Sequence, residues 1–281
     1  QVLLLLENGV VWTMVALFPM TVTLPQGETL SSAYIYALAT HPDARKKGFG
    51  RFILNYVDYY LQESGKDCVT IVPAEPSLYR YFATTGFEPT CSTRKVELLQ
   101  GMVDPPADGD RIAPVSPADY AALRERLLAG SFRVTYGESL LAYQQGLSRM
   151  EGGDLFRLTV AGKEGLAAAE YLDEDTVLVK ELLLPPAAQA GGAALLADRM
   201  PARRYQDLAG VPPGVHGAGL RLSVKYRRFS GTGAGRAAVF SLFGMHSKHR
   251  ILHFYPHFTA SLLYIDTVMQ VSVYKASRCC S

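Results

Sequence analysis

The chain has 281 residues, enough for one large domain or two ordinary ones, and its 48% hydrophobic and 19% charged residues exclude a disordered protein. The net charge of +2 is too small to indicate a nucleic-acid or membrane partner, and we expect neither. The four cysteines have neither the spacing of a disulfide framework nor that of a zinc site, so we expect a cytoplasmic protein without a metal.

The first hundred residues alternate between strand and helix signals. β-rich runs at 2–6 and 10–18 are joined by the turn sequence Glu-Asn-Gly, which cuts this apolar start into halves too short to span a membrane. A strand is predicted at 30–40, followed by an amphipathic helix from Phe49 that Gly65 ends. Further elements are predicted after this helix, namely strands at 68–73 and 92–99 and a helix at 76–87.

A second region of the same kind follows a linker at 101–110 that is rich in Gly, Pro and Asp. Its predicted elements are helices at 116–128, 137–150 and 191–200 and strands at 155–160, 165–172 and 176–184. After about residue 206 the hydrophobic pattern has no clear period. Residues 207–281 therefore form a poorly patterned tail that we assign to neither region.

The two regions share an internal echo. Residues 38–50 and 182–194 have one layout, in which a strand end is followed by proline, a polar residue and glycine. Three matched pairs define it: Pro42 with Pro186, Arg45 with Gln189, and Gly48 with Gly192. The echo predicts two copies of one α/β unit, the second of them degenerate, and the alternative is chance similarity between two stretches rich in Ala and Gly.

Gly48 and Gly50 stand at the mouth of the first predicted helix, among the basic residues Arg45, Lys46, Lys47 and Arg51. A helix N-terminus carries unpaired N–H groups and a partial positive charge, so it favours phosphate, and glycine lets a phosphate approach the backbone. Two interpretations are open: a pyrophosphate cradle, or a tight turn with a solvated basic rim. The same loose motif recurs at 189–194 and 228–233, but only the first match has a strand, a long helix and a strand around it.

The segment from Tyr34 to Phe87 resembles the core of the GNAT superfamily of acetyl-CoA-dependent N-acetyltransferases. The likeness rests on the strand, the Arg-Lys-Lys-Gly-Phe-Gly loop, the helix, the next strand and the closing Thr-Thr-Gly-Phe, and it covers residues 1–99. It implies an α/β fold with a mixed central sheet flanked by helices.

The resemblance also implies a domain organisation. Residues 1–100 would be a GNAT-like acetyltransferase domain without the family's opening strand and helices, which shape the acceptor side. Residues 111–206 would be a degenerate GNAT-like unit. This two-unit layout is similar to multidomain GNAT proteins such as the enhanced-intracellular-survival family.

The resemblance further implies a site for acetyl-CoA. The backbone of Ala37, Leu38 and Ala39 would bind the pantetheine arm. The pyrophosphate would be held, largely through backbone amides, by Arg45, Lys46, Lys47, Gly48, Phe49, Gly50 and Arg51. The strands at 33–39 and 68–72 would splay apart around the acetyl thioester. An amine would then attack the thioester carbonyl directly, while a backbone N–H polarises that carbonyl.

One residue departs from the family pattern. In the family's Phe-Tyr-x-x-x-Gly-Phe segment a tyrosine often protonates the departing thiolate, but here Phe82 occupies that position. Tyr79 and Tyr81 are the candidate proton donors, with water as a further donor and simple aromatic packing as the other interpretation of both residues. Because the pKa of a thiol is about 8.5, this proton is helpful rather than essential.

The sequence therefore predicts an N-acetyltransferase that moves an acetyl group from acetyl-CoA to a small-molecule or peptide amine. The alternative is a non-catalytic acyl-CoA-binding or regulatory module, which Phe82 and the absent opening elements favour. Side-chain type suggests three candidate general bases, and we assign the role to none of them: Glu7, His41 and Glu75. The sequence determines neither the acceptor nor the oligomeric state.

Overall fold

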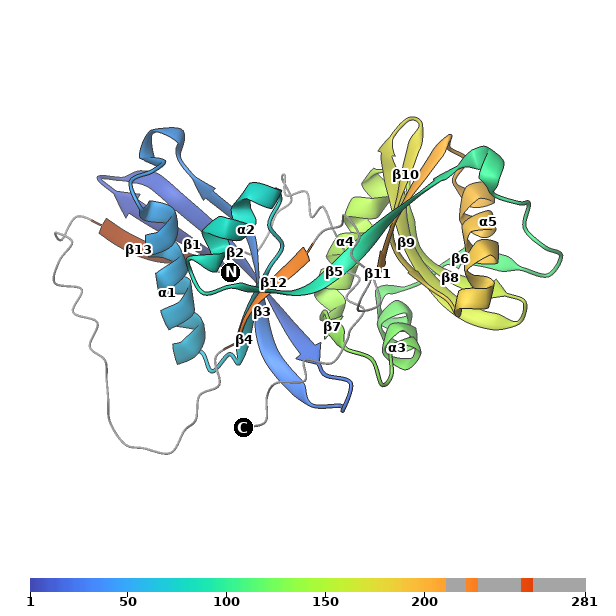
Figure 1. Cartoon of the computed structure of the whole chain (residues 1–281), viewed down its shortest axis with the longest axis horizontal. Helices are drawn as coiled ribbons and strands as arrows, with labels where there is room; N and C mark the ends of the chain where they lie inside the picture. The colour runs from blue at the N-terminus through green and yellow to red at the C-terminus, as the bar shows by residue number, and fades with distance from the viewer. Residues whose placement is uncertain (211–220, 227–248, 255–281) are drawn as a thin grey trace. The chain divides into compact units, whose positions relative to one another are not determined.

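The computed structural model describes residues 1–210, 221–226 and 249–254, and the chain forms two compact units (Figure 1). Unit 1 contains Gln1–Met20, Leu30–Thr90, most of β12 (Arg221–Tyr226) and β13 (His249–Phe254). Of the described residues, unit 2 contains Thr21–Thr29, Cys91–Gly210 and Arg221. Each unit is a mixed sheet flanked by helices, which confirms the predicted fold class.

Unit 1 has the sheet order β13-β1-β2-β3-β4-β12. Its remaining strands are β1 (Val2–Glu7), β2 (Val10–Thr23), β3 (Thr29–Thr40) and β4 (Cys68–Ile71). The strands β1 and β2 form an antiparallel hairpin, whereas β3 and β4 are parallel over Ser32–Ile35 and Cys68–Ile71. A parallel pair needs a crossover connection, which the helix between the two strands provides.

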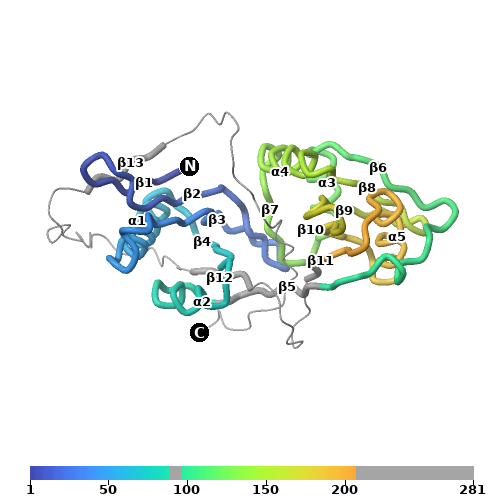
Figure 2. The backbone as a smooth tube through the Cα atoms, turned by 90° about the horizontal axis from the view of Figure 1, so that it is seen from above, coloured from blue at the N-terminus to red at the C-terminus, as the bar shows by residue number. Residues whose placement is uncertain are grey.

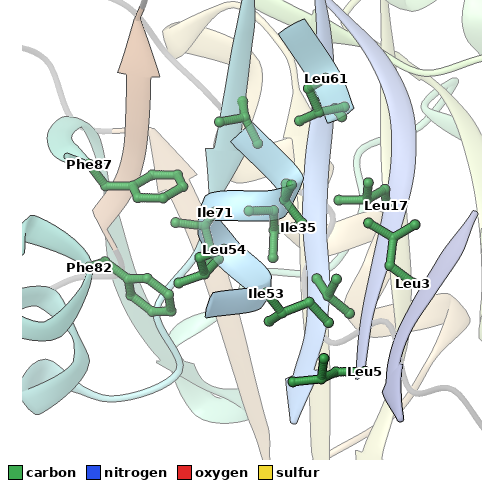
Figure 3. Close-up of a cluster of buried hydrophobic side chains, with 14 residues drawn as sticks. Leu3, Leu5, Leu17, Ile35, Ile53, Leu54, Leu61, Ile71, Phe82 and Phe87 are labelled. Atoms are coloured by element: carbon green, nitrogen blue, oxygen red, sulfur yellow. The ribbon is translucent and has the colours of Figure 1, made fainter. Parts of the chain in front are cut away.

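The helices of unit 1 lie over one face of this sheet (Figure 1). They are α1 (Phe49–Glu63) and α2 (Pro76–Ala83), and the one-turn 3₁₀ helix η1 (Pro42–Ala44) precedes them. The apolar stripe of α1 includes Ile53 and Val57, which pack with strand side chains and with Phe82 of α2 in one buried cluster (Figure 3). Gly65 ends α1 with a φ of 67°, as its position predicted.

Unit 2 has the sheet order β5-β11-β10-β9-β8-β6. The strands are β5 (Glu88–Leu99), β6 (Arg111–Pro114), β8 (Asp154–Val160), β9 (Lys163–Asp173), β10 (Thr176–Leu183) and β11 (Arg204–Gly210). A short strand, β7 (Arg133–Thr135), pairs with Thr21–Thr23 of β2. The predicted boundaries at 100 and 111 thus differ from the compact units, which divide the chain within the long strands β2 and β5.

Helices cover both faces of the unit 2 sheet, as both views show (Figures 1 and 2). They are α3 (Pro117–Leu127), α4 (Glu138–Met150) and α5 (Gln189–Arg199), with the short helices η2 (Gln100–Met102) and η3 (Pro186–Ala188). Neighbouring strand residues point to opposite faces, so Leu155 packs with α3 and α4 while Phe156 packs with α5.

The internal echo corresponds to a real structural repeat. Each unit runs strand, 3₁₀ turn, helix and parallel strand, as β3-η1-α1-β4 and as β10-η3-α5-β11. Pro42 and Pro186 begin the two 3₁₀ turns, and the third residue of each turn, Ala44 or Ala188, is buried. The repeat therefore extends to the packing of corresponding side chains.

Part of the tail has a place in unit 1 that its sequence does not predict. The strand β12 pairs antiparallel with β4, and β13 pairs antiparallel with β1. A tail strand obtains its partners from another part of the chain, so hydrophobic period alone does not reveal it. The rest of the tail beyond residue 210 lies outside the described residues. Over the described ranges, no helix is long and apolar enough to cross a membrane.

Unit 2 contains a buried polar cluster between α3 and β10. The Glu181 carboxylate accepts hydrogen bonds from the Tyr120 hydroxyl at 2.5 Å and from Arg124 Nε at 3.0 Å. Burial and the adjacent Glu181 carboxylate raise the pKa of Tyr120 well above its usual value, so the phenol keeps its proton. Burial lowers the pKa of Arg124, but Glu181, Tyr136 and Tyr120 together more than offset this effect, and the pKa lies above its usual value.

We predict that Glu181→Gln lowers the free energy of unfolding by about 3–5 kcal/mol, because it leaves the Arg124 charge buried without its partner. Urea unfolding followed by circular dichroism measures this change. The matched control is Arg126→Gln on the same helix, which breaks an exposed pair with Glu164 and is expected to cost less than about 1 kcal/mol. Equal losses in the two variants would contradict the role of the buried cluster.

Candidate functional site

The pairing between β3 and β4 ends before β3 does. The last paired residues are Ile35 and Ile71, and β3 continues to Thr40. Ala37, just beyond the paired region, has a left-handed backbone with a φ of 50°, which costs a non-glycine residue about 1–2 kcal/mol. The β4-facing edge of β3 is therefore without a β4 partner along Ala37, Leu38 and Ala39, the residues predicted to bind the pantetheine arm.

A short loop connects η1 to α1 and has an unusual backbone. Lys46 has a φ of 63°, and Gly48, the N-cap of α1, has a φ of 85°. Gly48 has no side chain and therefore provides no side-chain cap for the start of α1. Exposed basic side chains surround this helix start: Arg45, Lys46, Lys47 and Arg51. The N-terminus of a helix and positive side chains thus lie together at one point, an arrangement that suits an anion.

The two glycines of this loop are required for different reasons. A Cβ at Gly48 would meet no atom within 4 Å, so this glycine is explained by its left-handed φ. A Cβ at Gly50 would lie 2.8 Å from the Tyr81 hydroxyl oxygen and 3.6 Å from Thr40 Oγ1. Gly50 therefore makes room for the close approach of α2 and of the end of β3 to the first turn of α1.

Tyr81, Phe82 and Tyr79 occupy different positions on α2. Tyr81 is half buried beside Gly50, and burial raises the pKa of its phenol although the Arg51 charge opposes this effect. Phe82 is only 4% exposed and belongs to the core, where its ring contacts those of Tyr81 and Phe87. Tyr79 is also half buried. Of the two candidate proton donors, Tyr81 is thus the one that the structure brings to the loop.

Trp12 is a residue of this site that the sequence did not single out. It is the extra residue of a β-bulge in β2. Val11 pairs with Leu6 and Thr13 pairs with Leu5, so Trp12 has no opposite residue in β1. A bulge changes the direction of a side chain, and here the indole packs against the loop. Its ring centroid lies 5.4 Å from that of His41 and 6.4 Å from that of Phe49, and Lys47 Nζ lies 6.0 Å from it.

His41 and Glu75, two candidate bases, have local structural roles. The His41 ring nitrogen Nδ1 accepts the Asp43 amide N–H at 3.3 Å and so caps η1. Glu75 is the N-cap residue of α2 and accepts the Ser77 hydroxyl at 3.2 Å. In the described part of the chain, no cluster of three His, Cys, Asp or Glu residues could hold a metal ion.

The corresponding loop of unit 2 is built differently. The helix α5 begins at Gln189, directly after η3, with no left-handed residue between them. A Cβ at Gly191 would lie 2.5 Å from Val160 Cγ1, and one at Gly192 would lie 2.4 Å from Leu184 Cδ1. These glycines allow α5 to pack closely on the sheet. The third motif match, at 228–233, lies outside the described residues.

Comparison with known proteins gives one family match and several structural matches. Residues 1–89 match the model described as the acetyltransferase (GNAT) domain. A search of curated protein sequences gives no match.

The structure is similar to a GCN5-related N-acetyltransferase from Kribbella flavida, with a TM-score of 0.57, 16% identity and coverage of 79% of this chain. Eis1 from Mycobacterium abscessus matches with a TM-score of 0.56, 15% identity and coverage of 79%. A probable N-acyltransferase from Enterococcus faecalis V583 matches with a TM-score of 0.59, 15% identity and coverage of 77%. The chain spans 60%, 64% and 59% of the length of these three proteins. At sequence identities of 15% and 16%, the similarity shows a shared fold alone.

We predict that Gly50→Ala destabilises unit 1 by about 1–3 kcal/mol, because the new methyl group displaces the Tyr81 hydroxyl. Adding Tyr81→Phe removes that hydroxyl and is expected to recover most of the loss. Urea unfolding monitored by the fluorescence of Trp12, the chain's single tryptophan, measures both effects.

The control is Gly146→Ala within α4, where a Cβ meets nothing within 4 Å. Because alanine is the better helix former, we expect this variant to be as stable as the parent or more stable, by up to about 1 kcal/mol. Failure of Tyr81→Phe to restore stability would show that the hydroxyl is not the obstacle.

Proposed function

We propose, from the premise that residues 1–89 are a GNAT acetyltransferase domain, that the protein moves an acetyl group from acetyl-CoA to an amine. The observation that carries this proposal is the loop of Arg45–Gly48. It has two left-handed residues and leads into the uncapped N-terminus of α1, directly after a strand whose pairing with β4 has ended. We assign the pyrophosphate to this loop and the pantetheine arm to the free edge of β3.

The proposed chemistry is a direct acyl transfer. The free amine attacks the thioester carbonyl carbon, a C–N bond forms, and the C–S bond breaks. The amine nitrogen loses one proton to water or a base, and the departing thiolate accepts one. A backbone N–H at the edge of β3 beyond Ile35 would polarise the carbonyl oxygen.

We assign the proton for the thiolate to Tyr81. Its hydroxyl lies near Thr40, at the end of the strand to which we assign the pantetheine arm, and its raised pKa keeps the phenol protonated at neutral pH. The second candidate function is a non-catalytic acyl-CoA-binding module, and the observation that favours it is the burial of Phe82 in the core at the position where the family often has its acid. Both functions require the same loop to bind the cofactor.

We predict that acetyl-CoA changes the fluorescence of Trp12, because the indole packs on the loop that we assign to the phosphates. Gly48→Glu should raise the dissociation constant about a hundredfold or more, because its side chain brings a negative charge to the phosphate position. Fluorescence titration and calorimetry measure this constant.

Gly65→Glu is the matched control at the other end of α1. Both glycines have positive φ, and a Cβ at either position meets nothing within 4 Å, so the two variants carry similar backbone strain. We expect Gly65→Glu to bind acetyl-CoA as the parent does. Unchanged binding by Gly48→Glu would exclude the loop as the phosphate site.

We predict that Tyr81→Phe lowers kcat about tenfold and leaves the dissociation constant of acetyl-CoA within about twofold, since only the proton transfer is lost. Release of CoA thiol in the presence of amines measures the rate. Tyr79→Phe is the comparison on the same helix, and a larger loss there would assign the proton to Tyr79. A folded chain that binds acetyl-CoA but releases no thiol with any amine would support the binding-module alternative.

A further inference from the structure

Side chains connect the first turn of α1 with the last turn of α2. Arg51 is the third residue of α1, and its Nη2 donates a hydrogen bond to the Thr84 hydroxyl oxygen at 3.1 Å. The Thr84 hydroxyl in turn donates to the Tyr81 carbonyl oxygen at 2.7 Å. Thr84 is also the C-cap residue of α2, and its backbone N–H donates to the same Tyr81 carbonyl. We call Arg51, Thr84 and Tyr81 the α1–α2 link.

The link directs the charge of Arg51 toward α2. A cation in the first turn of a helix meets the positive end of the helix dipole, whereas a cation beside the last turn meets the negative end. The Arg51 side chain starts from the first turn of α1 and forms its hydrogen bond at the last turn of α2. Helix polarity therefore favours the bond with Thr84. Arg51 differs in this respect from Lys46 and Lys47, which precede α1.

The charge of Arg51 also acts on the Tyr81 phenol. The Tyr81 hydroxyl lies at the first turn of α1, since a Cβ at Gly50, the residue before Arg51, would be 2.8 Å from its oxygen. Burial raises the pKa of this phenol, and the Arg51 charge opposes the effect. A nearby cation favours the phenolate over the phenol. Arg51 therefore makes Tyr81 a better proton donor than burial alone would.

We propose, on the basis of the acetyl transfer proposed above, that Arg51 is a positioning residue that acts through Tyr81 and is not a ligand of the pyrophosphate. In the transfer, the Tyr81 O–H bond breaks as its proton moves to the departing CoA thiolate, and an S–H bond forms. The phenolate then takes a proton from water. While the phenolate lasts, the charge of Arg51 stabilises it.

Thr84 has a defined part in this proposal. A guanidinium donates in fixed directions, so the acceptor that it meets sets its orientation. Arg51 and Thr84 are both exposed, and an exposed arginine without an acceptor would sample many rotamers. Its charge would then spend less time beside the Tyr81 phenol. Because exposed charges are screened by salt and water, we expect the contribution of Arg51 to the rate to be modest.

The first experiment is calorimetric titration of the full chain with acetyl-CoA. Arg51→Gln should have the dissociation constant of the parent within about twofold, in contrast to Gly48→Glu in the phosphate loop. Binding with the parent constant also shows that the variant is folded. A larger increase of the constant in Arg51→Gln would make Arg51 a phosphate ligand and would overturn the proposal.

The second experiment measures kcat by CoA thiol release with n-butylamine, 2-phenylethylamine and spermidine. Arg51→Gln should lower kcat about threefold. Thr84→Val, which removes the hydroxyl and keeps the shape of the side chain, should do the same, whereas Thr84→Ser retains the hydroxyl and should restore the rate. In a chain that already carries Tyr81→Phe, Arg51→Gln should have no further effect, because the group through which it acts is gone.

The control is Arg80→Gln, which removes another exposed cation from the last turn of α2. We expect its kcat to stay within about 1.5-fold of the parent. An unchanged kcat in Arg51→Gln, or a loss that persists in the Tyr81→Phe chain, would overturn the role of Arg51 and leave the acetyl transfer standing. A chain that binds acetyl-CoA but acetylates none of the three amines would overturn the proposed function and this role with it.

Discussion

The proposed site of unit 1 depends on one feature of its sheet, namely that the pairing between β3 and β4 ends at Ile35 and Ile71. Along the paired part of two parallel strands, the backbone groups of each strand form hydrogen bonds with the other strand. Where the bonds stop, backbone groups of β3 lack partners within the sheet, and a buried group in that condition is costly. The left-handed Ala37 adds backbone strain at the same point. The surrounding core holds this segment in place, because Ile35 is buried and Leu38 packs against the same cluster.

The two units use glycine for different purposes at equivalent positions. In unit 1, Gly48 allows the left-handed turn from which α1 begins. In unit 2, Gly191 and Gly192 allow α5 to pack closely against Val160 and Leu184. The first glycine serves backbone conformation, and the other two serve the packing of a helix on its sheet. The two units therefore share the order of their elements, while the left-handed loop before the helix is found in unit 1 and not at the corresponding place in unit 2.

Several buried polar side chains of unit 2 form ion pairs and hydrogen bonds with one another. Glu181 meets Arg124 and Tyr120, and the neighbouring Lys180 pairs with Glu170 at 2.5 Å. Both strand residues are almost completely buried, and a register shift in β10 between Val179 and Glu181 accompanies them. Buried pairs of this kind are costly to break, and they join α3 to β10 through Glu181 and β10 to β9 through Lys180.

The sequence by itself determined the order of the main helices and strands up to residue 206 and the place of the glycine loop before α1. Hydrophobic period predicted α1 with its stop at Gly65, because a helix on a sheet must present one apolar stripe. The structure ends α2 at Ala83 rather than near Gly86 and reveals β7, since short elements carry little periodic signal. Tertiary structure alone decided which tyrosine reaches the loop, where Trp12 points, and which strands β12 and β13 join. Those features depend on contacts between residues far apart in the chain, and local sequence patterns carry no information about such contacts.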